Sequence, residues 1–114
     1  MSQNRFPLDA NGDVLRRLEE NGNDFNIPRD IDFQVVTPNE GAAERLADVV
    51  RSWGYSAKVV FEGCVPELPW EVHIVRHMLP THEGITRFEN ELEREAARVG
   101  GRNDGWGTFT VKAN

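Results

Sequence analysis

The sequence predicts an α+β fold, the ferredoxin-like βαββαβ arrangement, in which two helices cover one face of a four-stranded antiparallel sheet. Four short runs alternate in hydropathy or are rich in β-branched residues, which is typical of strands. Two longer segments carry apolar residues at spacings of three and four, which is typical of amphipathic helices. These elements follow one another as strand, helix, strand, strand, helix, strand, so two similar halves are expected to share one sheet.

A short helix is predicted before the first strand. Residues 1–10 carry no periodic pattern, so we expect a loose lead-in there and a single domain over residues 11–114. Apolar residues fall on one face of the segment 11–21, where Asn11 is a suitable N-cap and Gly22 follows the last turn. This helix is too short to be stable alone and must pack on the remainder of the fold.

The first strand and the first long helix are predicted on either side of a capping sequence. Residues 31–36 alternate between apolar and polar side chains, as in a strand with one buried face. Thr37 is the expected N-cap of the next helix, with Pro38 at its first position and Glu40 completing a capping box. Gly54 is expected to end this helix.

The second half repeats this plan. Residues 56–62 and 70–77 alternate again, and the short connector between them predicts an antiparallel pair. Thr81 is the expected N-cap of the second long helix, which ends before Gly100. The β-branched and aromatic run 108–111 predicts the fourth strand.

One face of the sheet is expected to stay free of helices. It mixes valine with polar side chains, so it is either a solvated surface or an interaction surface, and a homodimer through it is a further possibility. The expected occupants are Gln34, Val36, Lys58, Val60, His73, Val75 and His77.

A distinctive stretch precedes the predicted last strand. Asp104-Gly105 is a tight-turn signal, and Trp106 lies between two glycines, the second being Gly107. The indole is expected either to anchor the last strand on the core or to form part of a partner surface.

Composition restricts the possible partners. The chain has 114 residues and a formal net charge of −6, which argues against direct binding of nucleic acid and favours a basic protein partner. We expect no membrane span and no export signal, and the single cysteine agrees with a reducing compartment, so a cytoplasmic location is expected.

No catalytic, metal or cofactor site is predicted. His73 and His77 would lie about 13 Å apart along a strand and could not share an ion. His82 with His77 and Glu83 would make only a weak metal site. Cys64 has no predicted base beside it, so the sequence favours a protein without enzymatic activity.

Four segments are similar to a bacterial family, the regulators of ribonuclease activity B. LEENGND at 18–24 resembles the end of the family's leucine-rich helix, and WGY at 53–55 resembles its junction between first helix and second strand. The run 79–99 matches its second long helix, and DGWGT at 104–108 matches its closing motif. The resemblance covers about residues 11–112.

The resemblance implies a protein inhibitor of ribonuclease E that performs no chemistry. Such a protein binds the basic, non-catalytic C-terminal region of the ribonuclease and changes which RNAs are processed. The alternative is a ferredoxin-like module that binds or senses a small molecule. We expect the partner to contact acidic residues and the turn, namely Asp24, Asp30, Asp32, Asp104, Gly105, Trp106 and Gly107.

Overall fold

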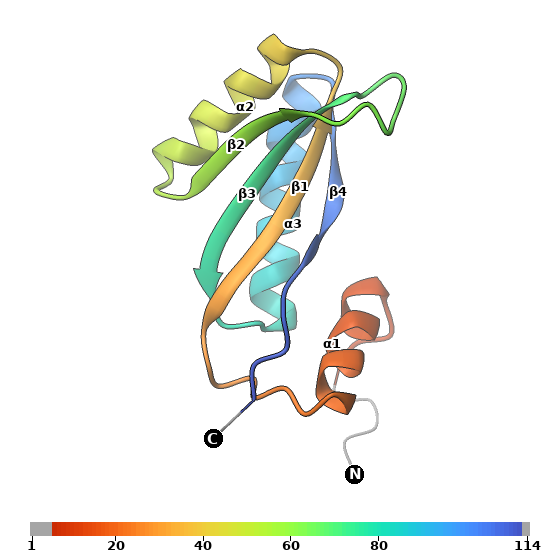
Figure 1. Cartoon of the computed structure of the whole chain (residues 1–114), viewed down its shortest axis with the longest axis vertical. Coiled ribbons are helices and arrows are strands. Elements are labelled where there is room, and N and C mark those ends of the chain that lie inside the picture. Colours follow the sequence, from red (N-terminus) through yellow and green to blue (C-terminus); the bar gives the residue numbers. More distant parts are fainter. Residues whose placement is uncertain (1–5, 113–114) are drawn as a thin grey trace.

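The computed structural model describes residues 6–112, and within them it contains three helices and one four-stranded antiparallel sheet in the order β2-β3-β1-β4 (Figure 1). The α+β class and the order of the elements are confirmed. The helices are α1 (Ala10–Glu20), α2 (Glu40–Ser52) and α3 (His82–Arg98), and the strands are β1 (Arg29–Thr37), β2 (Ser56–Phe61), β3 (Trp70–Met78) and β4 (Arg102–Gly107).

The hydrophobic core lies between the sheet and the helices α2 and α3. Alternate residues of the two central strands point into it, because side chains two apart on a strand share a face. Phe33 of β1 packs edge-on against Phe88 of α3, with ring centroids 4.7 Å apart. The largest fully buried members of the core are Leu15, Ile31, Phe33, Val35, Leu46, Val50, Val72, Ile74, Ile85, Phe88 and Leu92.

The short helix α1 lies beyond one end of the sheet rather than in the layer of α2 and α3 (Figure 1). Leu15 and Leu18 of α1 are buried in the common core cluster, so this helix depends on tertiary packing as expected. Phe6, in the predicted lead-in, is also buried and its ring packs 5.3 Å from that of Phe25.

Two of the three predicted helix caps are wrong. Helix α1 begins at Ala10, and its N-cap is Asp9 rather than Asn11. The cap of α2 is Asn39, whose Oδ1 accepts a 2.8 Å hydrogen bond from the N–H of Ala42. The third prediction is confirmed, because Thr81 caps α3.

The capping box proposed at Thr37 does not form because this threonine belongs to the sheet. Thr37 is the last residue of β1, and its hydroxyl donates a 3.0 Å hydrogen bond to the carbonyl of Trp70 on β3. Pro38 and Glu40 therefore do not hold the positions expected of them, since the helix starts at Glu40 itself.

The fourth strand also differs from the prediction. It spans Arg102–Gly107, so the DGWG stretch is part of a strand and not a turn before one, whereas residues 108–111 lie outside the strands. Val35 lies opposite Asn103 and Phe33 opposite Trp106, which leaves Asp104 and Gly105 together opposite a single residue of β1. This is a β-bulge, and Gly105 accommodates it with φ +109°.

The bounds of the other three strands agree with the ranges predicted from the sequence to within two residues. β1 pairs with β3 from Arg29↔Met78 to Thr37↔Trp70, and β2 pairs with β3 from Ser56↔Val75 to Phe61↔Trp70. Over residues 6–112, no helix combines the length and apolarity that crossing a membrane requires.

Candidate interaction surface

The sheet face opposite α2 and α3 is not covered by either helix. It carries the residues that alternate with the core positions of β1, β2 and β3, and all the predicted occupants of this open face lie on it. Most of these side chains are exposed or half-buried, but Val36 is buried between its neighbours Glu71 and Arg102. The open face is therefore mainly polar.

Three of the predicted acidic residues lie on this face, spaced along the adjacent strands β1 and β4. Asp30 and Asp32 lie two apart on β1 and are exposed. Asp104 is exposed on the neighbouring strand β4, where the bulge places it opposite Gln34. We call Asp30, Asp32 and Asp104 the acidic strip.

Asp24 does not join the acidic strip. It lies in the loop between α1 and β1, where its N–H donates a 2.7 Å hydrogen bond to the carbonyl of Val111. Its carboxylate accepts a 2.9 Å hydrogen bond from the N–H of Asn26, so the side chain is used in turn formation.

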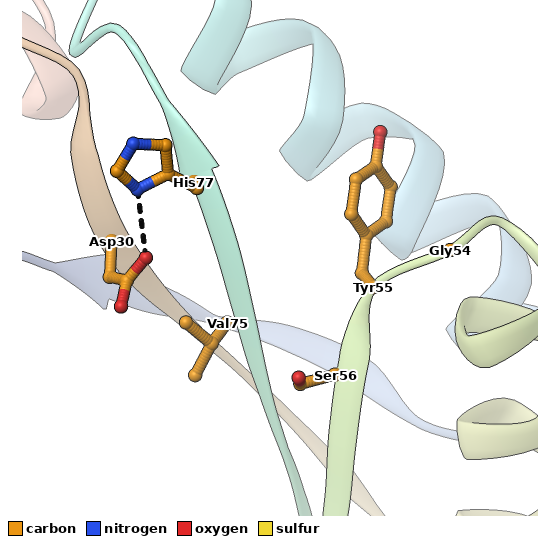
Figure 2. A pocket seen from close by; sticks show the side chains of 6 residues that line it. All are labelled: Asp30, Gly54, Tyr55, Ser56, Val75 and His77. Carbon is orange, nitrogen blue, oxygen red and sulfur yellow. Dashed lines mark hydrogen bonds and ion pairs between the residues drawn. The ribbon is translucent and has the colours of Figure 1, made fainter.

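A pocket of about 400 Å³ adjoins one end of the acidic strip (Figure 2). Asp30 Oδ1 lies 3.0 Å from Nδ1 of His77, and both side chains are well exposed. Val75 lies between this pair and Ser56 of β2. The pocket is lined by Asp30, Gly54, Tyr55, Ser56, Val75 and His77.

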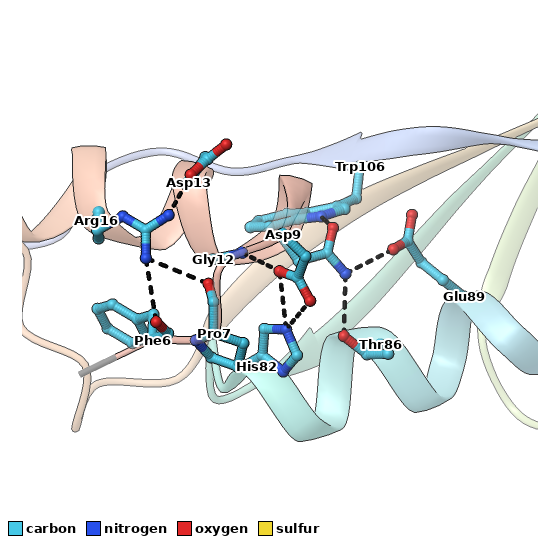
Figure 3. A network of polar contacts seen from close by, with 11 residues as sticks. Phe6, Pro7, Asp9, Gly12, Asp13, Arg16, His82, Thr86, Glu89 and Trp106 are labelled. Atoms are coloured by element: carbon cyan, nitrogen blue, oxygen red, sulfur yellow. Dashed lines mark hydrogen bonds and ion pairs between the residues drawn. The ribbon is translucent and has the colours of Figure 1, made fainter. Parts of the chain in front are cut away.

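Trp106 points the opposite way, toward the core. Its ring packs partly buried against the core cluster, and its Nε1 donates a 2.8 Å hydrogen bond to Oδ1 of Asn11 (Figure 3). The amide nitrogen of Asn11 in turn donates to Thr86 at 3.0 Å and to Glu89 at 2.8 Å. Asn11 thus connects α1 to both β4 and α3. Trp106 packs against the core and anchors β4 to it.

The N-cap of α1 is a second contact between α1 and α3. Asp9 accepts a 2.7 Å hydrogen bond from the N–H of Gly12, and Nε2 of His82 lies 2.9 Å from its Oδ2 (Figure 3). The backbone hydrogen bond from Gly12, followed by the contact with His82, lowers the pKa of Asp9 below its usual value. His82 therefore pairs with Asp9, and not with the His77 and Glu83 considered from the sequence.

The remaining two histidines also have separate partners. His77 contacts Asp30, whereas Nε2 of His73 lies 3.0 Å from Oε1 of Glu71. The two rings are thus directed to different carboxylates.

Sequence reasoning missed the role of Arg29. This arginine is buried, with 6% of its surface exposed, and burial lowers the pKa of its guanidinium. It donates hydrogen bonds to the carbonyls of Asp24 at 2.7 Å and Phe109 at 3.2 Å. A lone arginine after Pro28 carries no local signal of burial, and one of its partners, Phe109, lies 80 positions away in the sequence.

The chain was compared with known proteins. The family model described as regulator of ribonuclease activity B matches residues 8–108, which include every helix and strand found within residues 6–112 and the DGWGT motif. No curated protein matches the chain. Since the match covers most of the 114 residues, the chain belongs to the family of the regulator of ribonuclease activity B.

Proposed function

We propose that this protein regulates a ribonuclease, possessing no enzymatic activity of its own, by binding a basic segment of it through the acidic strip. The family is one of ribonuclease regulators, which supports a ribonuclease as the partner. Ribonuclease E, through its arginine-rich C-terminal region, is the specific partner that we propose. Binding there would alter which RNAs are processed.

The observation that carries this proposal is the presence of three exposed carboxylates on one uncovered sheet face. Asp30, Asp32 and Asp104 come from two adjacent strands, so their relative positions are fixed by the sheet. Exposed carboxylates in a fixed array attract an arginine-rich segment over a long range and can accept bidentate hydrogen bonds from its guanidinium groups. In this role Gly105 would shape the strip, Gly107 would leave room beside Asp32, and Trp106 would hold β4 in place from the core side.

We infer a ferredoxin-like arrangement for the domain. The supporting observations are the strand order β2-β3-β1-β4 and the helices that connect β1 to β2 and β3 to β4. Such a fold leaves one sheet face available to a partner. A fold of this kind hosts many functions, so the assignment rests on the family and the surface rather than on topology.

A calorimetric titration with a peptide from the arginine-rich region of ribonuclease E tests the proposal. The triple variant Asp30→Asn/Asp32→Asn/Asp104→Asn is expected to bind at least about tenfold more weakly than the parent protein. Binding should also weaken as salt is added, because exposed charges are screened. Absence of binding by the parent protein at low salt would exclude this partner.

A matched control distinguishes the acidic strip from net charge alone. The triple variant Glu40→Gln/Glu44→Gln/Asp48→Asn removes the same charge from exposed positions of α2, on the other side of the sheet. We expect its affinity to stay within about threefold of the parent value. Equal losses in both triple variants would show that overall charge, and not this face, governs binding.

The pocket beside Asp30 favours a second candidate function, the binding of a small molecule. Its volume of about 400 Å³ lies in the range of ligand sites, and His77, Asp30 and Ser56 offer polar groups. A thermal-shift screen against metabolites tests it, because a ligand of the folded state raises the melting temperature. A Ser56→Trp variant, which fills the pocket, should abolish any such shift.

A homodimer through the open face is a further proposal about the same surface. It would cover the acidic strip and compete with the basic peptide. Analytical ultracentrifugation with and without the peptide tests this. If the two interactions compete, the peptide should convert the dimer into peptide-bound monomers.

A further inference from the structure

A cluster of two carboxylates and one imidazole lies on the open face, at the end of the sheet away from the pocket. Ligand atoms of Glu62, Glu71 and His73 all lie within 4.8 Å of one another. The hairpin of β2 and β3 brings them together, since Glu71 and His73 are two apart on β3 and Glu62 follows β2. We propose that these three residues form a binding site for a divalent transition-metal ion of the Zn²⁺ type.

The donor set has the chemistry that such an ion requires. Imidazole nitrogen together with carboxylate oxygen is a common combination around Zn²⁺, and three protein ligands leave one position for water or a partner's group. Two ionised carboxylates also balance the charge of a divalent cation. A hard ion such as Mg²⁺ prefers oxygen ligands alone, so His73 discriminates against it.

The geometry is close to what coordination needs. Ligand atoms around a tetrahedral Zn²⁺ lie about 3.3 Å apart, given metal–ligand bonds of about 2.0 to 2.1 Å. Nε2 of His73 already lies 3.0 Å from Oε1 of Glu71. The metal would replace the proton shared by these two atoms, and the imidazole would then carry its proton on Nδ1.

The backbone holds all three residues in place. Glu71 and His73 belong to β3, which is paired on both sides by β1 and β2. The N–H groups of Glu62 and Gly63 both donate to the carbonyl of Pro69, at 2.9 and 3.0 Å, which extends the hairpin beyond β2. Only the exposed side chain of Glu62 has to move, so little order must be created on binding.

The site is distinct from the acidic strip and does not depend on the proposed function. In the sheet register, Glu71 lies opposite Val36, whereas Asp30 lies opposite His77 at the far end of the same strand pair.

Titration of the full chain with Zn²⁺, in competition with a chromophoric chelator, tests the site. Cys64 is an exposed free thiol, so every protein carries Cys64→Ser to remove an unrelated ligand. We expect one equivalent of Zn²⁺ per chain, with affinity reduced at least about tenfold by His73→Gln and by Glu62→Gln. Mg²⁺ at the same concentrations is expected not to compete.

His77→Gln is the matched control, because it removes a histidine from the same strand but from outside the cluster. Its Zn²⁺ affinity should remain within about twofold of the parent value. In NMR spectra of the unsubstituted cluster, Zn²⁺ should shift the ring resonances of His73 and not those of His77. Lack of Zn²⁺ binding, or a loss with His77→Gln equal to that with His73→Gln, would overturn the proposal.

Discussion

The indole Nε1 of Trp106 donates a 2.8 Å hydrogen bond to Oδ1 of Asn11, and this contact joins residues 95 positions apart in the sequence. It connects the edge strand β4 with the N-terminal helix, and the same asparagine reaches α3 through Thr86 and Glu89. The open face on the other side of β4 is therefore supported by a polar network that lies behind it.

Replacement of Trp106 by alanine should destabilise the protein by about 3 kcal/mol, because the ring is packed against the core and leaves a cavity. Trp106→Phe retains most of the apolar area and loses the N–H donor, so it should cost only about 1 kcal/mol. Urea unfolding monitored by circular dichroism measures both losses of stability. If Trp106→Ala were as stable as the parent protein, the ring could not be the anchor described here.

The Asn11–Trp106 hydrogen bond should appear as an energetic coupling. In a double-mutant cycle of Asn11→Ala and Trp106→Phe, we expect a coupling of about 1 kcal/mol. The same cycle built from Trp106→Phe and Ser52→Ala, at the far end of α2, should give a coupling near zero. Coupling energies of equal size in the two cycles would contradict a direct interaction.

The network also shows where local sequence patterns stop being informative. Thr81 and Gly22 were placed correctly because capping and left-handed glycines are decided within one helical turn. Asn11 satisfies the composition of an N-cap, yet its side chain is engaged by residues 75 to 95 positions away. Asp9, two residues earlier, takes the cap instead.

The misplaced fourth strand has a similar origin. The segment Arg102–Gly107 is rich in polar residues and glycine, so intrinsic strand preference favours the later run 108–111. Pairing with β1 overrides this preference. Gly101 allows β4 to pair with β1 from Arg102 onward, because a Cβ at position 101 would lie 2.4 Å from the carbonyl oxygen of Val36. The acidic strip could thus be predicted in part, but its assembly from β1 and β4 could not.

The bulge at Gly105 gives a prediction with an internal control. Gly105→Ala should destabilise the protein by about 1 to 2 kcal/mol, because φ is +109° and a side chain strains this backbone. Gly107→Ala should be nearly neutral, since no atom lies within 4 Å of the added Cβ and φ is not in the left-handed region. Thermal unfolding of both variants is the measurement. An added Cβ meets no atom within 4 Å at either position, so equal effects would show that the backbone conformation at Gly105 is not a source of strain.

The cap of α1 should make stability depend on pH in the acid range. The pKa of Asp9 is lowered, first by the hydrogen bond from Gly12 and then by His82. A lowered carboxyl pKa contributes stability above the unfolded value of 3.8, and this contribution is lost as pH falls through the folded pKa. Asp9→Asn can still accept the bond from Gly12 and removes only the ionisation.

We therefore expect the parent protein to exceed Asp9→Asn in stability near neutral pH, and the difference to shrink below about pH 4. Urea unfolding midpoints measured from neutral to acid pH test this. Asp48→Asn, an exposed acid on α2, controls for the change in net charge. A difference that grows on acidification would contradict the assigned sign.

Arg29 should be irreplaceable even by lysine. Its guanidinium donates to the carbonyl oxygens of Asp24 and Ile27, both at 2.7 Å, and of Phe109 at 3.2 Å, and it also contacts Oδ1 of Asn23. It thereby joins the loop before β1 to the segment that follows β4. Lysine keeps the charge, but its single ammonium cannot present donors in these several directions, and the charge would be buried with fewer partners.

Arg29→Lys is expected to lower the free energy of unfolding by about 2 to 3 kcal/mol, as measured by urea denaturation. Hydrogen exchange should speed up at the amides of Asp24 and Val111, whose bonds depend on the same junction. Arg87→Lys is the control, because Arg87 forms an exposed ion pair with Glu83 and its replacement should change stability by less than about 0.5 kcal/mol. An equally small effect at Arg29 would mean that the guanidinium geometry is not what holds the two segments together.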